Sequence, residues 1–260
     1  MFRVARGCVG LIAICFALLV QAQEQDIEAL VRAAEQGDAA AQIRLGEMYY
    51  WLGRNARDYD EAIKWYRKAA EQGDSEAQSK LAQMYYSGEG VAQDYAEAVK
   101  WYTRLAERER GSSHSQFWLG EMYYSGQGVT RDFAKAMKWF AQAEVRAREE
   151  GNDRIESNAQ YRLGLMYAKG QGVKVKRNYA EAMKWYRKAA ENSHGGALFE
   201  LGKMYANGLG VAKNFAEAVK LWKRATERGS GDARRALERA AKQGNKDAKK
   251  VLETVEEDPC

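Results

Sequence analysis

The block Leu45-Gly46-Glu47-Met48-Tyr49-Tyr50 decides the fold, because variants of it recur four more times along the 260 residues. The later versions begin at Leu81, Leu119, Leu163 and Leu201, so successive leucines are 36, 38, 44 and 38 residues apart. A period in this range is typical of stacked supersecondary units, each too small to bury its apolar face alone. The sequence therefore predicts an all-α solenoid of five repeats.

Each repeat is expected to consist of two helices joined by a glycine turn. The first helix carries the block, and a Gly-x-Gly-Val turn follows it at Gly88, Gly126, Gly170 and Gly208. Glycine accepts the positive φ angles that a tight turn between helices requires. The second helix then begins at a side chain that can accept hydrogen bonds from its first N–H groups. These predicted capping residues are Asp58, Asp94, Asp132, Asn178 and Asn214.

The second helices carry alanine and a large apolar residue on one face, because the two recur three residues apart. The pairs are Ala62 and Trp65, Ala98 and Trp101, Ala136 and Trp139, and Ala182 and Trp185, with Leu221 in the last repeat. We therefore expect Trp139 to be buried between the third repeat and its neighbour. The interval from Trp139 to Leu163 is 24 residues, against 16 or 18 elsewhere. This predicts either about two extra helical turns near Glu144 or a bulged junction.

These periods divide the chain into segments, with a half-repeat at each end to supply the polar caps that a solenoid needs. The expected segments are a signal peptide at 1–22, an N-terminal capping helix at 23–37, repeats at 38–73, 74–111, 112–154, 155–192 and 193–229, and a C-terminal cap and tail at 230–260. The third repeat is the one with the extended second helix.

The first 22 residues have the pattern of a secretory signal. Arg3 and Arg6 precede an apolar run from Cys8 to Val20, and Ala22 offers a small residue for cleavage. The run is shorter than the roughly 20 residues that span a bilayer, which favours cleavage over a membrane anchor. We therefore expect an exported protein, periplasmic or secreted, with no stable membrane insertion after cleavage.

Charge and cysteine usage exclude further classes. Removing Arg3 and Arg6 leaves 39 basic residues (41 − 2) against 36 acidic ones, a net charge of +3. This mild excess argues against a nucleic-acid-binding protein, which would show a basic stripe. Cys260 is then the single cysteine, so no intramolecular disulfide can form. Cys260 is either a thiol in a loose tail or the link of a disulfide-bonded dimer.

The repeated motifs resemble those of the Sel-1-like repeat (SLR) family, which is related to the tetratricopeptide repeats. Residues 38–229 match its pattern five times, although Leu52-Gly53-Arg54-Asn55 replaces the glycine turn of the first repeat and Ser115 replaces an alanine in the third. The resemblance implies a right-handed superhelix that binds a protein or peptide on its concave face. It further implies a non-enzymatic scaffold or adaptor of the bacterial envelope.

The same resemblance implies two alternative functions. Some exported bacterial members are immunity proteins that neutralise secreted toxins such as phospholipase effectors. A cysteine-rich branch is linked to β-lactam hydrolysis, but that branch carries a disulfide in each repeat, and this chain does not. A cell-wall or β-lactam hydrolase is therefore disfavoured.

A stripe on the first helices is the candidate binding surface. On a helical wheel, the repeat-defining residues of the block cover the packing faces, and positions −5, −1, +2 and +6 from each leucine remain available. The candidate partner-binding residues are Arg44, Glu47, Trp51, Lys80, Gln83, His114, Trp118, Glu121, Arg162, Leu165, Lys169, Glu200 and Lys203.

The large apolar residues on this stripe have two possible roles. Trp118 and Trp51 are either anchors for a partner, since aromatic anchors dominate interface energies, or side chains packed against a neighbouring repeat. By contrast, Phe117, Tyr161 and Phe199 occupy position −2 of their repeats, a regular aromatic site that we expect in the core.

The sequence contains little that indicates catalysis. His114 and His194, the two histidines, stand near the starts of first helices, and no His-Glu-x-x-His or Cys-x-x-Cys motif accompanies them. No serine lies in a Gly-x-Ser-x-Gly elbow. We therefore expect no catalytic residue, no metal and no cofactor.

Overall fold

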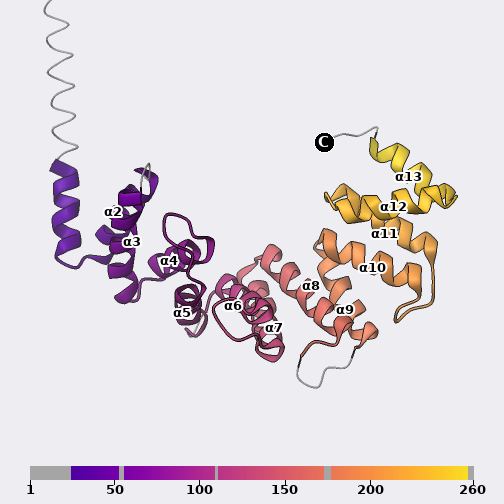
Figure 1. Ribbon diagram of the computed structural model, residues 1–260, viewed down its shortest axis with the longest axis horizontal. Helices are drawn as coiled ribbons and strands as arrows, with labels where there is room; N and C mark the ends of the chain where they lie inside the picture. The colour runs from indigo at the N-terminus through magenta and orange to yellow at the C-terminus, as the bar shows by residue number, and fades with distance from the viewer. Residues whose placement is uncertain (1–24, 53–55, 109–110, 173–176, 257–260) are drawn as a thin grey trace, which may run out of the picture. The chain divides into compact units, whose positions relative to one another are not determined.

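The computed structural model describes residues 25–52, 56–108, 111–172 and 177–256 (Figure 1). These residues form α-helices and turns without a strand, which confirms the predicted all-α repeat solenoid. The predicted signal peptide and Cys260 lie outside the described residues, as does most of the unusual turn of the first repeat. No helix in the described ranges is both long enough and apolar enough to cross a membrane.

The chain divides into two compact units, residues 1–101 and 102–260. In the first unit, a helical segment at 25–35 precedes α2 (Ala39–Leu52), α3 (Ala56–Glu71), α4 (Ser75–Ser87) and the start of α5 (Tyr95–Ala106). The second unit holds α6 (Ser113–Ser125), α7 (Phe133–Glu150), α8 (Asp153–Lys169), α9 (Tyr179–Glu191), α10 (Gly195–Asn207), α11 (Phe215–Glu227), α12 (Gly231–Lys242) and α13 (Lys246–Glu256).

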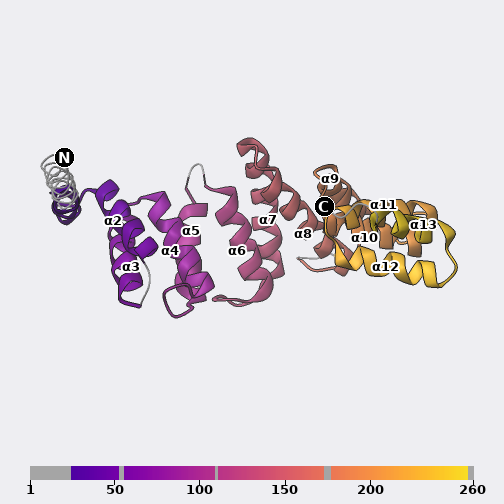
Figure 2. The same cartoon turned by 90° about the horizontal axis from the view of Figure 1, so that it is seen from above.

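Within each compact unit, the helix pairs of successive repeats stack on one another. Within the second unit, α6 packs on α7, α8 on α9 and α10 on α11, while α7 packs on α8 and α9 on α10 (Figures 1 and 2). The first helices of successive repeats also meet, since α6 contacts α8. This stacking places the first helices of adjacent repeats side by side on one surface.

The local capping predictions hold for four of the five second helices. The side chains of Asp94, Asp132, Asn178 and Asn214 each accept a hydrogen bond from a backbone N–H two or three residues ahead, at 2.9–3.1 Å. Asp58 does not cap its helix, because α3 already begins at Ala56. The glycines after α4, α6, α8 and α10 adopt φ of +70° to +80°, as the turn pattern predicted.

The prediction of a buried Trp139 is wrong, because Trp139 is half-buried and the next residue, Phe140, is fully buried. A Cβ atom added to Gly120 on α6 would lie 2.6 Å from Phe140 Cδ1. The glycine of the block therefore lets the backbone of the first helix lie directly against the ring that follows the tryptophan. Gly46 with Tyr66, Gly164 with Tyr186 and Gly202 with Trp222 repeat this close approach.

The long interval of the third repeat lengthens two helices. α7 has 18 residues and ends at Gly151 in the left-handed conformation, and α8 has 17 residues. The additional length places Glu144 in the interior, where it is 4% exposed. There it pairs with Arg148 and accepts a hydrogen bond from Gln160 at 3.2 Å, so the insertion brings its own polar network.

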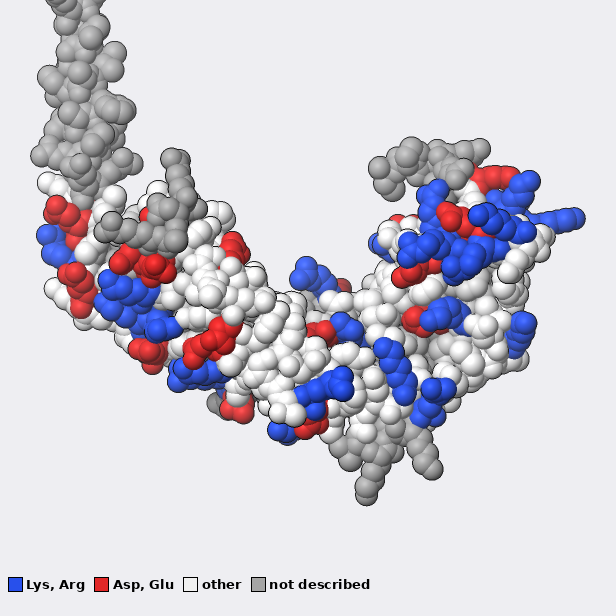
Figure 3. Space-filling model, viewed as in Figure 1, with Lys and Arg blue, Asp and Glu red and all other residues white. Residues whose placement is uncertain are grey.

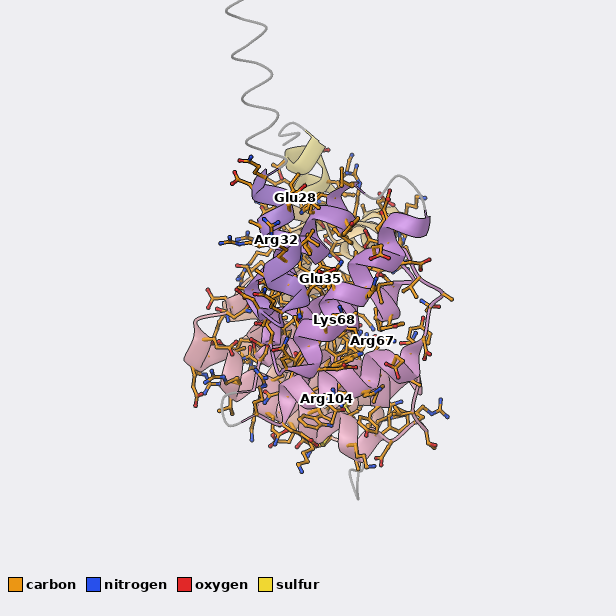
Figure 4. All side chains as sticks on the ribbon, turned by 90° about the vertical axis from the view of Figure 1, so that its left-hand side faces the viewer. Glu28, Arg32, Glu35, Arg67, Lys68 and Arg104 are labelled. Carbon is orange, nitrogen blue, oxygen red and sulfur yellow. The ribbon has the colours of Figure 1, made fainter. Side chains whose placement is uncertain are left out.

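The segment at 25–35 presents charged side chains outward. Glu28, Arg32 and Glu35 lie along it, as Figure 4 shows, and Glu28 and Arg32 form an exposed ion pair of 3.7 Å. A pair this exposed adds little to stability, but a polar outer face is what the terminal unit of a repeat stack requires.

Candidate functional site

The first unit carries five of the predicted partner-binding residues on α2 and α4. Arg44, Trp51 and Gln83 are exposed, and Glu47 and Lys80 are half-buried. Trp51 is 80% exposed, so its indole is not packed into the core of the described residues. All five remain predictions, because their placement shows access to solvent and nothing about a partner.

The second unit carries the other eight, and none of them is fully buried. They are His114, Trp118 and Glu121 on α6, Arg162, Leu165 and Lys169 on α8, and Glu200 and Lys203 on α10. Three of these, namely His114, Trp118 and Arg162, line one cavity of about 510 Å³. We name this cavity pocket A. Its lining residues are His114, Phe117, Trp118, Arg154, Ile155, Asn158, Tyr161, Arg162 and His194.

His194 is held rigidly at the edge of pocket A. Its Nδ1 accepts a hydrogen bond from Ala197 N at 3.1 Å, capping α10, and its Nε2 lies 3.1 Å from Asn158 Oδ1. Because Nδ1 is an acceptor and Oδ1 accepts only, these partners select the neutral form with the proton on Nε2. Burial lowers the pKa of His194, and the charge of Arg162 lowers it further.

A stacked pair of rings forms one wall of the pocket. Tyr161 lies against His194 with ring centroids 4.6 Å apart and planes inclined by 26°. A Cβ atom on Gly196 would lie 3.1 Å from both Tyr161 Cζ and His194 Cε1, so the stack uses the space that this glycine leaves. Tyr161, expected in the core, packs against the core cluster while it is partly exposed and lines the pocket.

The opposite wall is built from α6. Trp118 Nε1–H donates to His114 Nε2 at 3.0 Å, and the indole meets Phe117 edge-on at 6.0 Å. Burial lowers the pKa of His114, and the charge of Arg154 adds to this effect. Phe117 is 9% exposed and belongs to the core as expected. The indole of Trp118 is thus fixed by a hydrogen bond while its face stays half-buried.

Arg162 and Glu121 form an ion pair that joins α8 to α6. Arg162 Nη2 donates to Glu121 Oε2 at 2.6 Å, and Nε lies 2.6 Å from Oε1 without making a hydrogen bond. Burial raises the pKa of Glu121, whereas the charge and hydrogen bond of Arg162 act in the opposite direction. Arg162 therefore reaches the pocket with most of its charge already compensated.

Arg154 differs from Arg162 in its exposure to solvent and in its lack, among the described residues, of an ion-pair partner. It is exposed, and within the described residues its side chain makes no hydrogen bond or ion pair. The helical wheel places neither Arg154 nor His194 on the stripe, because both residues precede the repeated block from which the stripe positions are counted. The early start of α8 at Asp153 is the feature that brings Arg154 to the pocket.

A second cavity of about 410 Å³, which we name pocket B, lies between α10, α11 and α12. Its lining residues are Phe199, Lys203, Ala206, Asn207, Lys213, Phe215, Trp222, Ala236, Arg239, Ala240 and Gln243. Trp222 Nε1–H donates to the Phe199 carbonyl at 3.2 Å, and Lys203 pairs with Glu200 at 2.8 Å. Phe199, expected in the core, is half-buried and lines this pocket.

The His, Cys, Asp and Glu side chains of the described residues do not gather into a metal centre, and the basic side chains of α12 and α13 are interspersed with acidic ones. No group of three or more His, Cys, Asp or Glu residues there could hold a metal ion. Lys and Arg side chains gather over α12 and α13 with acidic ones between them (Figure 3). Asp232 and Glu238, for example, pair with Arg235 and Arg234 at 2.6 and 3.3 Å, as expected for a solvated face.

Comparisons with known proteins agree with this architecture. A family model described as Sel1 repeat matches residues 39–74, 75–109, 113–144, 157–194 and 196–230. No sequence among the curated proteins matches the chain significantly.

The chain is also similar to proteins of known structure. The chain is similar to a Sel1 repeat protein from Oxalobacter formigenes, with 25% identity and a TM-score of 0.65 over 90% of this chain and 98% of that one. It is also similar to a protective antigen of uropathogenic Escherichia coli that displays an SLR fold, with 32% identity, a TM-score of 0.48 and coverage of 89% and 56%. An immunity protein from Pseudomonas aeruginosa matches at 20% identity and a TM-score of 0.42, over 75% and 68%.

Proposed function

Because the chain belongs to the Sel1 repeat family, whose members are generally protein-interaction scaffolds, we propose that it is a non-enzymatic adaptor that binds a protein or peptide on the stripe formed by its first helices. Pocket A lies on the part of that surface that the second unit contributes. A β-lactam and peptidoglycan turnover assay tests the non-enzymatic part of the proposal, and turnover that survives further purification would contradict it.

The observation that carries the proposal is the fixed arrangement of aromatic and polar side chains in pocket A. The indole of Trp118 is bonded to His114, and the ring of Tyr161 is stacked on His194. Side chains ordered before a partner arrives lose little conformational entropy on binding. Half-buried tryptophan and tyrosine are also the residue types that most often dominate binding energy. These features support a protein-binding surface.

Truncation of Trp118 tests the proposal. The purified protein captures partners from an envelope extract, mass spectrometry identifies them, and calorimetry compares the wild type with Trp118→Ala. We expect the variant to weaken the complex by about 2 kcal/mol or more, the scale of a hot-spot residue. Val145→Ala is the matched control, since Val145 is an exposed apolar residue on the second helix α7. Equal affinities for both variants and the wild type would exclude pocket A as the binding centre.

We further propose that the protein acts in the bacterial envelope after export. The support is the pattern of residues 1–22, and the expected mature N-terminus is Gln23. Cell fractionation and N-terminal sequencing check this, and a soluble cytosolic product that retains Met1 would contradict it. A non-reducing gel of the exported protein tests whether Cys260 links two copies.

Immunity against a secreted toxin remains an alternative form of the same activity. It predicts one tightly bound partner encoded beside this gene, whereas an adaptor predicts partners from the envelope machinery. The identity of the captured proteins distinguishes the two.

A further inference from the structure

Pockets A and B are cationic, and neither has an acidic side chain among its described lining residues. A third cavity, on the side of α9 and α11, gives the contrast. It is lined by Arg187 and Arg224, but also by Glu191 and Glu217, so its charges balance within the protein. Pockets A and B thus leave positive charge uncompensated on α8, on the turn after α10 and on α12.

The uncompensated charge comes from three side chains. Arg154 in pocket A, and Lys213 and Arg239 in pocket B, are exposed. Within the described residues, none of the three makes a side-chain hydrogen bond or an ion pair. The other cations of the two pockets are already paired, Arg162 with Glu121 and Lys203 with Glu200. Arg154, Lys213 and Arg239 are therefore the groups that can receive an anion from a partner.

α10 connects the two pockets. His194, directly before α10, lines pocket A, and Asn207, its last residue, lines pocket B. The thirteen steps between them correspond to about 20 Å along the helix axis. An extended peptide advances about 3.3 Å per residue, so about six residues cover this distance.

We propose that the partner of this scaffold presents an acidic, extended segment that crosses α10. One Asp or Glu side chain pairs with Arg154 in pocket A, and a second, about six residues away, pairs with Lys213 and Arg239 in pocket B. The inference rests on the proposed function and names the chemistry of the partner.

The aromatic walls favour a peptide over a nucleic acid. Trp118 and Tyr161 in pocket A and Phe199 in pocket B offer apolar contact to residues beside each carboxylate. A nucleic acid would instead need a continuous row of cations along its phosphates. Here the acidic Glu200, paired at 2.8 Å with Lys203 of pocket B, interrupts the row of cations along α10.

Selection from a phage library of random 12-residue peptides on the purified protein tests the proposal. The enriched peptides are synthesised with fluorescein, and their affinities are measured by anisotropy at low and high salt. We expect pairs of Asp or Glu five to seven residues apart, with binding weakened about fivefold or more when either is changed to Gln. We also expect weaker binding at high salt, because exposed charge pairs are screened.

Protein variants assign the effect to the two pockets. Arg154→Gln and Arg239→Gln should each weaken binding about fivefold or more, and the double variant more than either. Arg187→Gln, which removes an exposed arginine from α9, should change it less than about twofold. Melting curves of Arg154→Gln and Arg239→Gln should match the wild type, because neither side chain has a partner to lose among the described residues, and Arg187→Gln loses only an exposed hydrogen bond to the Tyr205 hydroxyl. If Arg154→Gln or Arg239→Gln melts at a lower temperature than the wild type, the corresponding lysine variant replaces it in the test. Arg154→Lys and Arg239→Lys keep the positive charge and should therefore retain binding.

Four outcomes would overturn the inference. Enriched peptides without acidic residues, or acidic peptides whose affinity is unchanged in Arg154→Gln and Arg239→Gln, would refute the acidic segment while the scaffold function stands. Failure of every peptide and every envelope protein to bind would refute the scaffold function as well. Tighter binding of a labelled 12-residue oligothymidine, lost in the same variants, would mean that the ligand is a nucleic acid.

Discussion

Gly120→Ala should destabilise the protein even though alanine is the better helix former. The added Cβ would lie 2.6 Å from both Cδ1 and Cε1 of Phe140, and that ring is fully buried. Phe140 also packs on Phe117, with ring centroids 5.6 Å apart. The ring cannot move into solvent, so α6 and α7 must separate to restore ordinary contact distances.

The magnitude follows from two opposing effects. Overpacking a tight core contact costs about 1–3 kcal/mol, and replacing glycine by alanine inside a helix returns about 1 kcal/mol. At a contact this short the overpacking cost is near the top of its range, so the net loss should be about 1–2 kcal/mol. Gly120→Val adds two methyl groups beyond that Cβ and gains less helix propensity than alanine, so it should cost about 3 kcal/mol.

Urea denaturation followed by circular dichroism measures these differences. Gly231→Ala is the matched control, because a Cβ there would have only Arg235 Nη1 nearby, at 3.5 Å. It should leave stability unchanged or raise it by up to about 1 kcal/mol. Phe140→Leu, which shortens the opposing side chain, should reduce the cost of Gly120→Ala in the double variant.

A midpoint for Gly120→Ala at or above that of the wild type would refute the reasoning, as would strictly additive effects in the double variant. The second block has Ala82 where the others have glycine. A methyl group at this position is therefore compatible with the fold when the two helices of the repeat lie far enough apart. The experiment measures the free energy that α6 and α7 lose in reaching such a separation.

Burial lowers the pKa of His114 and His194 in the folded state, so the unfolded chain takes up protons first and stability should fall as pH drops below about 6.5. Thermal melts from pH 7.5 to 5 check this, and His194→Asn, which can still cap α10, should flatten the profile; an unchanged slope would contradict it. Arg162→Ala should cost about 1–3 kcal/mol by leaving the half-buried carboxylate of Glu121 without its partner, measured by urea denaturation, with Glu121→Gln in the same background expected to recover part of the loss. Asp132→Ala should cost about 1 kcal/mol, because its carboxylate accepts hydrogen bonds from Ala134 N and Lys135 N, and a melt identical to the wild type would show that the cap contributes nothing.

None of the thirteen stripe residues predicted from the helical wheel is fully buried, yet the wheel could not indicate which of them act together. Arg162 and Glu121 were predicted separately as partner-binding residues, but they lie 2.6 Å apart and pair with each other across two repeats. Arg154 and His194, which complete pocket A, lie outside the register of the block. The distance between side chains of different repeats depends on how far each helix pair rotates on the next, and a single repeat does not contain that information.

What the sequence by itself determined is local and periodic. The spacing of the leucine blocks, the glycines with φ near +70° and the capping side chains of Asp94, Asp132, Asn178 and Asn214 are interactions within a few residues, so their patterns can be read directly. Only the tertiary structure decided that Phe140 rather than Trp139 is the buried residue, because that depends on which side chain lies opposite Gly120. It also decided that α6, α8 and the start of α10 enclose pocket A, since the packing of one helix pair on another sets the distance between their side chains.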